Sequence, residues 1–483
     1  MRKNTSRGFA LALTLFIIVI LAIVCFGALN VATLDSRTAT EDIRASRAFY
    51  AARAGIAYAK SKIAQGHNSG NFNNVYLDGQ NGSEYDEHFS IVITPAANND
   101  TREQLVWRVE SEGKCDGATR KIVAFLQREL FSVYGYFTDI DSLESAQIFF
   151  IDSDRITGKV HTNTFFSVSG HPQFNSLVTS ANENDSYYNS SSKSYKGGST
   201  DNQDFYRANS SQDTDRMTAL DDSAAFSFHG AQPRIDLPES TTTEIKENSA
   251  KTVCTKANGD EGNCSFVDSN VSNYRVIFSS DSSGSYAKIY KGVTKTTTTT
   301  TGSGRNRKTV TTTTTTYSSS PDFTVDTTQI PTVMYFSGAV ETYGTVKGRV
   351  TMACTGDVNI TDNLSYSNSK EDVLGLMAEQ NVIIKTSTTE QKDIDIDASI
   401  MALKGSFTVD QYNTGVHRGA INFFGSLVQY KRGAVGQMGN PGTGYDKNYV
   451  YDEKLRRNPP AYWPWDNKFD IIYFVDKGSL GGV

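Results

Sequence analysis

One apolar segment near the N-terminus constrains this chain of 483 residues more than any other feature. Residues Phe9–Leu29 contain one clearly polar side chain, Thr14, and the next charge is Asp35. As an α-helix rising about 1.5 Å per residue, the run covers roughly 30 Å, the thickness of a bilayer core. Residues 1–8 carry three basic side chains and no acidic one, so we expect them in the cytoplasm and the rest outside. The sequence predicts a single-pass membrane protein with an extracytoplasmic C-terminal part.

Three kinds of segment fit such a run. A cleaved secretory signal has a shorter apolar region ending in small residues, and Ala28-Leu29-Asn30 fits this poorly. A plain signal anchor explains the span and nothing more. The third is a helix that continues past the membrane, because residues 31–65 are rich in alanine and contain no proline and one glycine, Gly55. We therefore predict one helix over residues 9–65, amphipathic in its second half and ended by Gly66.

The N-terminus resembles the class III signal of type IV pilins: a basic leader, a Gly8-Phe9 junction, a long apolar run and an amphipathic continuation. The stretch Ser46–Gly55 is similar to the A-F-Y-A-A-x-A-G segment of PilX-like minor pilins and of the large K-type minor pseudopilin of type II secretion. The resemblance implies that a prepilin peptidase cuts between Gly8 and Phe9 and methylates the new amine. It also implies packing against the helices of other pilin-like subunits. The side chains we expect in that packing are Phe9, Leu13, Phe16, Ile20 and Ile23.

Leu13 departs from the family pattern. In ordinary pilins the fifth mature residue is a glutamate that pairs with the free N-terminus of a neighbouring subunit. A carboxylate in hydrocarbon needs such a partner, and leucine can take no part in the pairing. Large minor subunits that lack this glutamate are thought to start or cap a filament, so the resemblance favours a minor subunit at a tip or cap.

The expected fold class is α+β, with a small antiparallel sheet after the helix and a large all-β domain beyond it. Residues 66–130 contain three alternating runs, at 88–94, 104–110 and 118–128, that can pack on the amphipathic half of the helix as in pilins. Any α+β sandwich fits this alternation too. Residues 131–483 alternate short Val, Ile, Phe and Tyr runs with Gly, Asn and Asp turns, which favours a β-solenoid without a strict repeat. Several blocks there resemble uncharacterised β domains that follow PilX-like N-termini, a resemblance that implies no activity.

Two low-complexity insertions interrupt the β domain, near residues 180–215 and 295–320. The second contains two runs of six threonines around a Gly- and Arg-rich centre. Threonine favours strands and the centre favours a turn, so a long exposed hairpin and a solvated loop both fit.

Residues able to carry chemistry are sparse. Cys254 and Cys264 flank a polar loop, and we predict a disulfide between them in an oxidising compartment, with Cys115 and Cys354 unassigned. His161 and His171, near two aspartates, fit turn and strand-end positions better than a metal or acid–base cluster. The alternating acids at 393, 395 and 397 fit a solvated strand face more simply than a Ca²⁺ site. No nucleotide, metalloprotease or hydrolase motif is present, so we predict neither an enzyme nor a cofactor.

The sequence thus predicts a filament subunit held in the inner membrane until assembly and displaying a β domain for adhesion or partner recognition, with a surface or glycan ligand as one candidate. The competing class is a membrane-anchored envelope β-solenoid enzyme or binding protein acting on polysaccharide. The continuous helix beyond the span discriminates between them, because an anchored enzyme does not need it. The net charge of −6 offers no basic face for nucleic acid.

Overall fold

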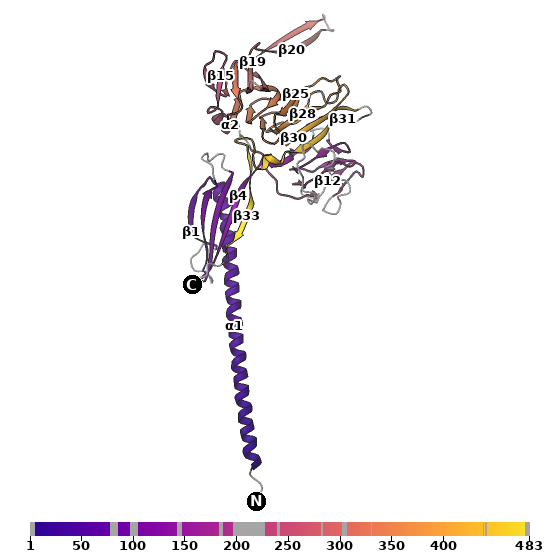
Figure 1. Cartoon of the computed structure of the whole chain (residues 1–483). Coiled ribbons are helices and arrows are strands. Elements are labelled where there is room, and N and C mark those ends of the chain that lie inside the picture. The colour runs from indigo at the N-terminus through magenta and orange to yellow at the C-terminus, as the bar shows by residue number, and fades with distance from the viewer. Residues whose placement is uncertain are drawn as a thin grey trace. The chain divides into compact units, whose positions relative to one another are not determined.

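The chain forms two compact units, Met1–Arg128 with Asn467–Val483 (unit 1) and Glu129–Asp466 (unit 2). Figure 1 shows both in the computed structural model. The structure describes residues 5–77, 86–96, 105–142, 147–182, 187–196, 228–238, 242–281, 284–301, 307–329, 331–437, 439 and 442–478.

Unit 1 is a long helix with an antiparallel sheet at its C-terminal half (Figure 1). Helix α1 (Thr5–Ala64) has 60 residues, so it is about 90 Å long. It ends in a Schellman motif: Gly66 has φ +92°, its N–H donates to Ile63 O, and His67 N–H donates to Lys62 O. The sheet consists of β1 (Gly70–Tyr76), β2 (Glu87–Pro95), β3 (Val106–Cys115), β4 (Ala118–Leu130) and β33 (Trp465–Asp476), in that order. The predicted α+β class, with a long helix before a mostly β remainder, is confirmed.

Small residues on one helix face let α1 lie close to the sheet. The alternating strands turn one apolar face towards that helix face, which gives unit 1 its core. The buried residues of this core are Ala52, Ile56, Ala59, Ile63, Phe89, Ile91, Ile93, Trp107, Val109, Ile122, Ala124 and Leu126.

Strand β33 makes unit 2 an insertion between two neighbouring strands of one sheet. The sequence assigned its residues to the exported β domain, but the structure pairs the strand with β4 in unit 1. The Phe469 ring contacts Trp107, and Lys60 Nζ donates to the carbonyl of Phe469 at 3.1 Å. Local alternation cannot reveal this pairing, because the partner strand lies more than 300 residues earlier.

Unit 2 consists almost entirely of short strands. Its elements are η1 (Phe131–Val133), β5 (Tyr134–Ile140), β6 (Phe150–Ile151), β7 (Arg155–Ile156), β8 (Lys159–Thr162), β9 (Ser167–Ser169), β10 (Gln173–Phe174), β11 (Val178–Ser180), β12 (Tyr187–Asn189), β13 (Ser194–Lys196), β14 (Phe228–His229), α2 (Thr242–Ser249), β15 (Val253–Lys256), β16 (Glu261–Asn263), β17 (Ser265–Phe266), β18 (Asn273–Asp281), β19 (Gly284–Thr301), β20 (Lys308–Tyr317), β21 (Phe323–Asp326), β22 (Thr332–Phe336), β23 (Ala339–Val346), β24 (Arg349–Cys354), β25 (Val358–Tyr366), β26 (Val373–Ala378), β27 (Val382–Ile384), β28 (Ile394–Ala402), β29 (Phe407–Val409), β30 (His417–Lys431), β31 (Gly436–Gln437), β32 (Thr443–Tyr451) and η5 (Glu453–Arg456).

Parallel ladders organise these strands. One ladder runs β17-β22-β24-β26-β28-β30-β5-β8-β11-β14, and a second runs β18-β23-β25-β27-β29. Met352 pairs with Leu376 and Leu376 with Ile400, an interval of 24 residues each time. Inward-facing side chains of successive strands stack into one continuous apolar core.

The chain enters this ladder in its middle. From β5 it runs to one end through β8, β11 and β14, resumes at the other end with β17, and returns strand by strand to β30 beside β5. The first and last segments of unit 2 therefore meet, and Phe131 N–H donates to Pro464 O at 3.0 Å.

The threonine-rich insertion is a hairpin. Strands β19 and β20 pair antiparallel over ten residue pairs, from Gly292↔Tyr317 to Thr301↔Lys308. Three cross-strand threonine pairs, Thr294–Thr315, Thr298–Thr311 and Thr300–Thr309, are hydrogen-bonded through their hydroxyls. The turn, residues 302–306, and much of the 180–215 insertion lie outside the described residues.

Candidate functional sites: an exposed helix and a cleft

The N-terminal half of α1 carries a large exposed apolar surface. Every described side chain from Phe9 to Ile43 is exposed. Among the described residues, one helix is long and apolar enough to cross a membrane, with a mean hydropathy of 3.0 in its most apolar window. Apolar surface of this extent is stable only in a bilayer or against other helices, so the helix is compatible with a single-pass anchor.

The residues expected to pack against other subunits all lie on this surface. The exposed fractions of Phe9, Leu13, Phe16, Ile20 and Ile23 are 73%, 48%, 62%, 45% and 66%. The bond between Gly8 and Phe9 lies in α1, one turn after its start at Thr5. The first four N–H groups of a helix have no partner within it, so this turn opens more readily than any later one. Cutting there requires only that local opening.

Two glycines set the distance between α1 and the sheet. A Cβ atom at Gly113 of β3 would lie 2.1 Å from Ala48 O and 2.3 Å from Ala52 N of the helix backbone. A Cβ atom at Gly55 of α1 would lie 2.1 Å from Ser111 Oγ. The alanines and Gly55 of the stretch Ser46–Gly55 are thus the residues that allow the helix to lie against β3.

The predicted disulfide between Cys254 and Cys264 is absent: all five cysteines of the chain are described, and all are free thiols. The two side chains nevertheless hydrogen-bond each other, and both are buried at the β15–β16 hairpin. Their spacing gave the proximity correctly, because Cys254 pairs opposite Gly262, two residues before Cys264. The hydrogen bond from Cys254 and burial both raise the pKa of the Cys264 thiol far above its usual range. Cys354 and Cys115 are also buried.

The histidines and aspartates weighed as chemical groups serve the fold. His161 is buried and bonds Thr179 and Asn163, while His171 is exposed beside Asp152. The acidic row is not uniformly solvated, because Asp397 is buried and accepts from Tyr366 N–H at 2.9 Å. In the described part of the chain, no group of three or more His, Cys, Asp or Glu side chains is placed to hold a metal ion.

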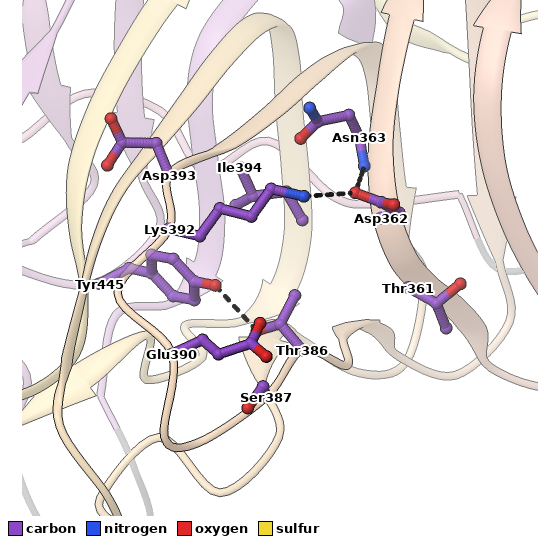
Figure 2. A pocket seen from close by; sticks show the side chains of 10 residues that line it. All are labelled: Thr361, Asp362, Asn363, Thr386, Ser387, Glu390, Lys392, Asp393, Ile394 and Tyr445. Carbon is purple, nitrogen blue, oxygen red and sulfur yellow. Dashed lines mark hydrogen bonds and ion pairs between the residues drawn. The ribbon is translucent and has the colours of Figure 1, made fainter.

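Figure 2 shows a small polar cavity of about 170 Å³ beside that acidic row. Lys392 Nζ pairs with Asp362 at 3.1 Å across it, and Tyr445 OH bonds Thr386 Oγ1 at 2.8 Å. Its polar groups largely satisfy one another, so it offers few open positions to a ligand.

A larger cavity of about 690 Å³ shares Tyr445 with it. The walls include Phe149, Tyr412 and the pair formed by His417 Nε2 and Asp446 Oδ2 at 3.2 Å. Sequence reasoning missed this cleft, because its lining comes from segments almost 300 residues apart and forms no local motif.

Comparisons with known proteins add one partial match. The family model described as "Domain of unknown function (DUF4900)" matches residues 85–182, about a fifth of the chain, from the end of unit 1 into unit 2. A search of curated proteins finds no match. Among solved structures, the competence-associated pilin ComZ from Thermus thermophilus matches with a TM-score of 0.28 and 12% identity, over 90% of this chain and 97% of that one. We draw nothing about fold or function from a TM-score this low.

Proposed function

We propose that this chain is a minor subunit of a type IV pilus-like filament, assembled through α1 and displaying unit 2. The observation that carries the proposal is the division of α1 into an exposed apolar half and a half packed on a small antiparallel sheet. An anchor needs only the first half. Helix-to-helix packing in a filament uses the first half and needs a rigid second half to hold the head.

Leu13 supports a position at the tip or cap of the filament. It is an exposed apolar residue in the membrane-spanning part of α1, so this subunit offers no carboxylate at that position to the amine of a neighbour. The partners implied are other pilin-like subunits, a prepilin peptidase, the inner membrane and a ligand of unit 2. The mature chain would then lie on the cell surface, and its role would be adhesion or partner recognition rather than catalysis.

Unit 2 is the part that carries specificity in this proposal. The parallel ladders at 24-residue intervals support reading it as a β-solenoid, a rigid body suited to display. The alternative is an anchored envelope protein that acts on polysaccharide, which the His417–Asp446 pair at a cavity wall favours.

N-terminal mass spectrometry of the protein made in its own host tests the proposal. We expect a chain beginning with a methylated Phe9, and Gly8→Val should keep Met1 because a branched side chain blocks the junction. Gly27→Ala is the matched control, since a Cβ there meets nothing within 4 Å. A native protein that keeps Met1 would contradict the filament proposal and leave the anchored alternative.

A further inference from the structure

The 690 Å³ cleft in unit 2 contains an unsatisfied carboxylate oxygen. Asp154 is fully buried, and its Oδ2 accepts from Lys447 Nζ at 2.6 Å and from Ile151 N–H at 3.0 Å. Its Oδ1 has no hydrogen-bond partner among the described residues. A buried acceptor without a donor costs about 1–3 kcal/mol, so the geometry leaves a place for a donor from a ligand.

Aromatic rings and further polar groups surround this oxygen. Phe149 and Tyr412 are half-buried, which leaves part of each ring open to the cleft, and Tyr445 adds a third ring. The exposed amides of Asn413 and Gln437 lie on the same lining. A volume of this size lies within the range of small-molecule sites, and the mixture of flat rings and scattered polar groups is typical of them.

The charge of the cleft restricts the ligand. Asp154 and Asp446 contribute two negative charges, and Lys447, which already pairs with Asp154, contributes one positive charge. Asp446 is held by Ser153 Oγ at 3.2 Å and by His417. The remaining field is negative, so an anionic ligand is repelled, whereas a neutral ligand that donates hydroxyl hydrogens is attracted.

We propose that this cleft binds a neutral saccharide, whose C–H faces stack on the rings and whose hydroxyls donate to Asp154 Oδ1 and Asp446. The proposal deepens the recognition role proposed above for unit 2. Binding is measured on the single subunit, so a failure to bind and a failure to assemble are separate results.

The test is isothermal titration of the full chain in a detergent without a sugar headgroup, such as lauryldimethylamine oxide. The probes are cellotriose, maltotriose and chitotriose, with trigalacturonate as the anionic comparison and tetra-alanine as a ligand that offers amides instead of hydroxyls. We expect at least one neutral sugar to bind, and trigalacturonate and tetra-alanine to bind at least about tenfold more weakly, the equivalent of about 1.4 kcal/mol.

Two variants connect that binding to the cleft. Tyr412→Ala removes a ring from the lining and Asp446→Asn an acceptor charge, and each should weaken binding about five- to tenfold. Tyr430→Ala is the matched control, because Tyr430 is exposed and lies outside the lining. Asp154 is left intact, because its Oδ2 holds the buried Lys447. The proposal is overturned if none of the three neutral sugars binds, if trigalacturonate or tetra-alanine binds equally well, or if folded Tyr412→Ala keeps full affinity.

Discussion

The contact between α1 and β3 makes Gly113→Ala the most informative single substitution in unit 1. The added Cβ would lie 2.1 Å from Ala48 O and 2.3 Å from Ala52 N. Both atoms belong to the helix backbone and cannot rotate away as the end of a side chain can. Either the helix or the strand must therefore move, which loosens the apolar core between them.

The cost can be ranked against a second substitution. Overpacking a well-packed core costs about 1–3 kcal/mol, and Gly113→Ala should reach the upper end because its obstacles are backbone. Gly55→Ala should cost about 1 kcal/mol, because its nearest obstacle is the hydroxyl of Ser111 at 2.1 Å. That hydroxyl has no hydrogen-bond partner in the described part of the chain. Ser111→Ala should therefore be tolerated alone, and should rescue Gly55→Ala but not Gly113→Ala.

Urea unfolding in detergent, read by hydrogen exchange of the amides in residues 48–63, measures these differences in one helix segment. The double variants form a thermodynamic cycle that isolates the contact between positions 55 and 111. Gly27→Ala controls for the change of glycine to alanine in the same helix, because it meets no neighbour. The reasoning is refuted if Gly113→Ala shifts the free energy of unfolding by less than about 0.5 kcal/mol, or if Ser111→Ala rescues both glycine variants equally.

Three further predictions concern other parts of the chain. Export should join Cys254 and Cys264, because their thiols already touch in a buried hairpin; peptide mapping without reductant should find them linked, and free alkylation of both would contradict this. The hydrogen bond from Lys121, with Arg108 adding to it, lowers the pKa of Glu110, so its stabilisation is present above the ordinary carboxyl range and disappears as the pH falls through the lowered value. Glu110→Gln should therefore destabilise the protein by up to about 1 kcal/mol at pH 7 and by nothing at about pH 3 in urea titrations, and an equal difference at both pH values would exclude this pair as the cause. Replacing Thr296–Thr313 with a two-residue turn should leave the melting midpoint of unit 2 unchanged, because Thr296–Thr300 are exposed; a lower midpoint would show that the ribbon supports the core.

The parts of the fold that local patterns determine could be predicted from the sequence. The apolar run, the alanine-rich continuation and Gly66 define α1 because helix periodicity and capping act within a few residues. The three alternating runs became β2, β3 and β4 for the same reason. The threonine runs left two possibilities open, and cross-strand pairing decides for the hairpin.

The remainder depends on contacts between distant residues. Tyr136 pairs with Leu427 in the centre of unit 2, and no property of either segment names the other as its partner. The cleft arises in the same way, from Asp154, Tyr412 and Tyr445 on separate passes of the chain. The cysteine spacing predicted that the two thiols meet but not the state of the bond, since redox chemistry is not encoded in spacing.

The place of β33 has a consequence for synthesis. A ribosome makes α1 and the first four strands of unit 1 early, but the fifth strand follows only after all of Glu129–Asp466. Until then the edge of β4 stays open and Trp107 lacks its contact with Phe469. A chain that terminates prematurely inside unit 2 can never close this sheet. Completion of the small sheet thus reports that the entire inserted domain has been translated.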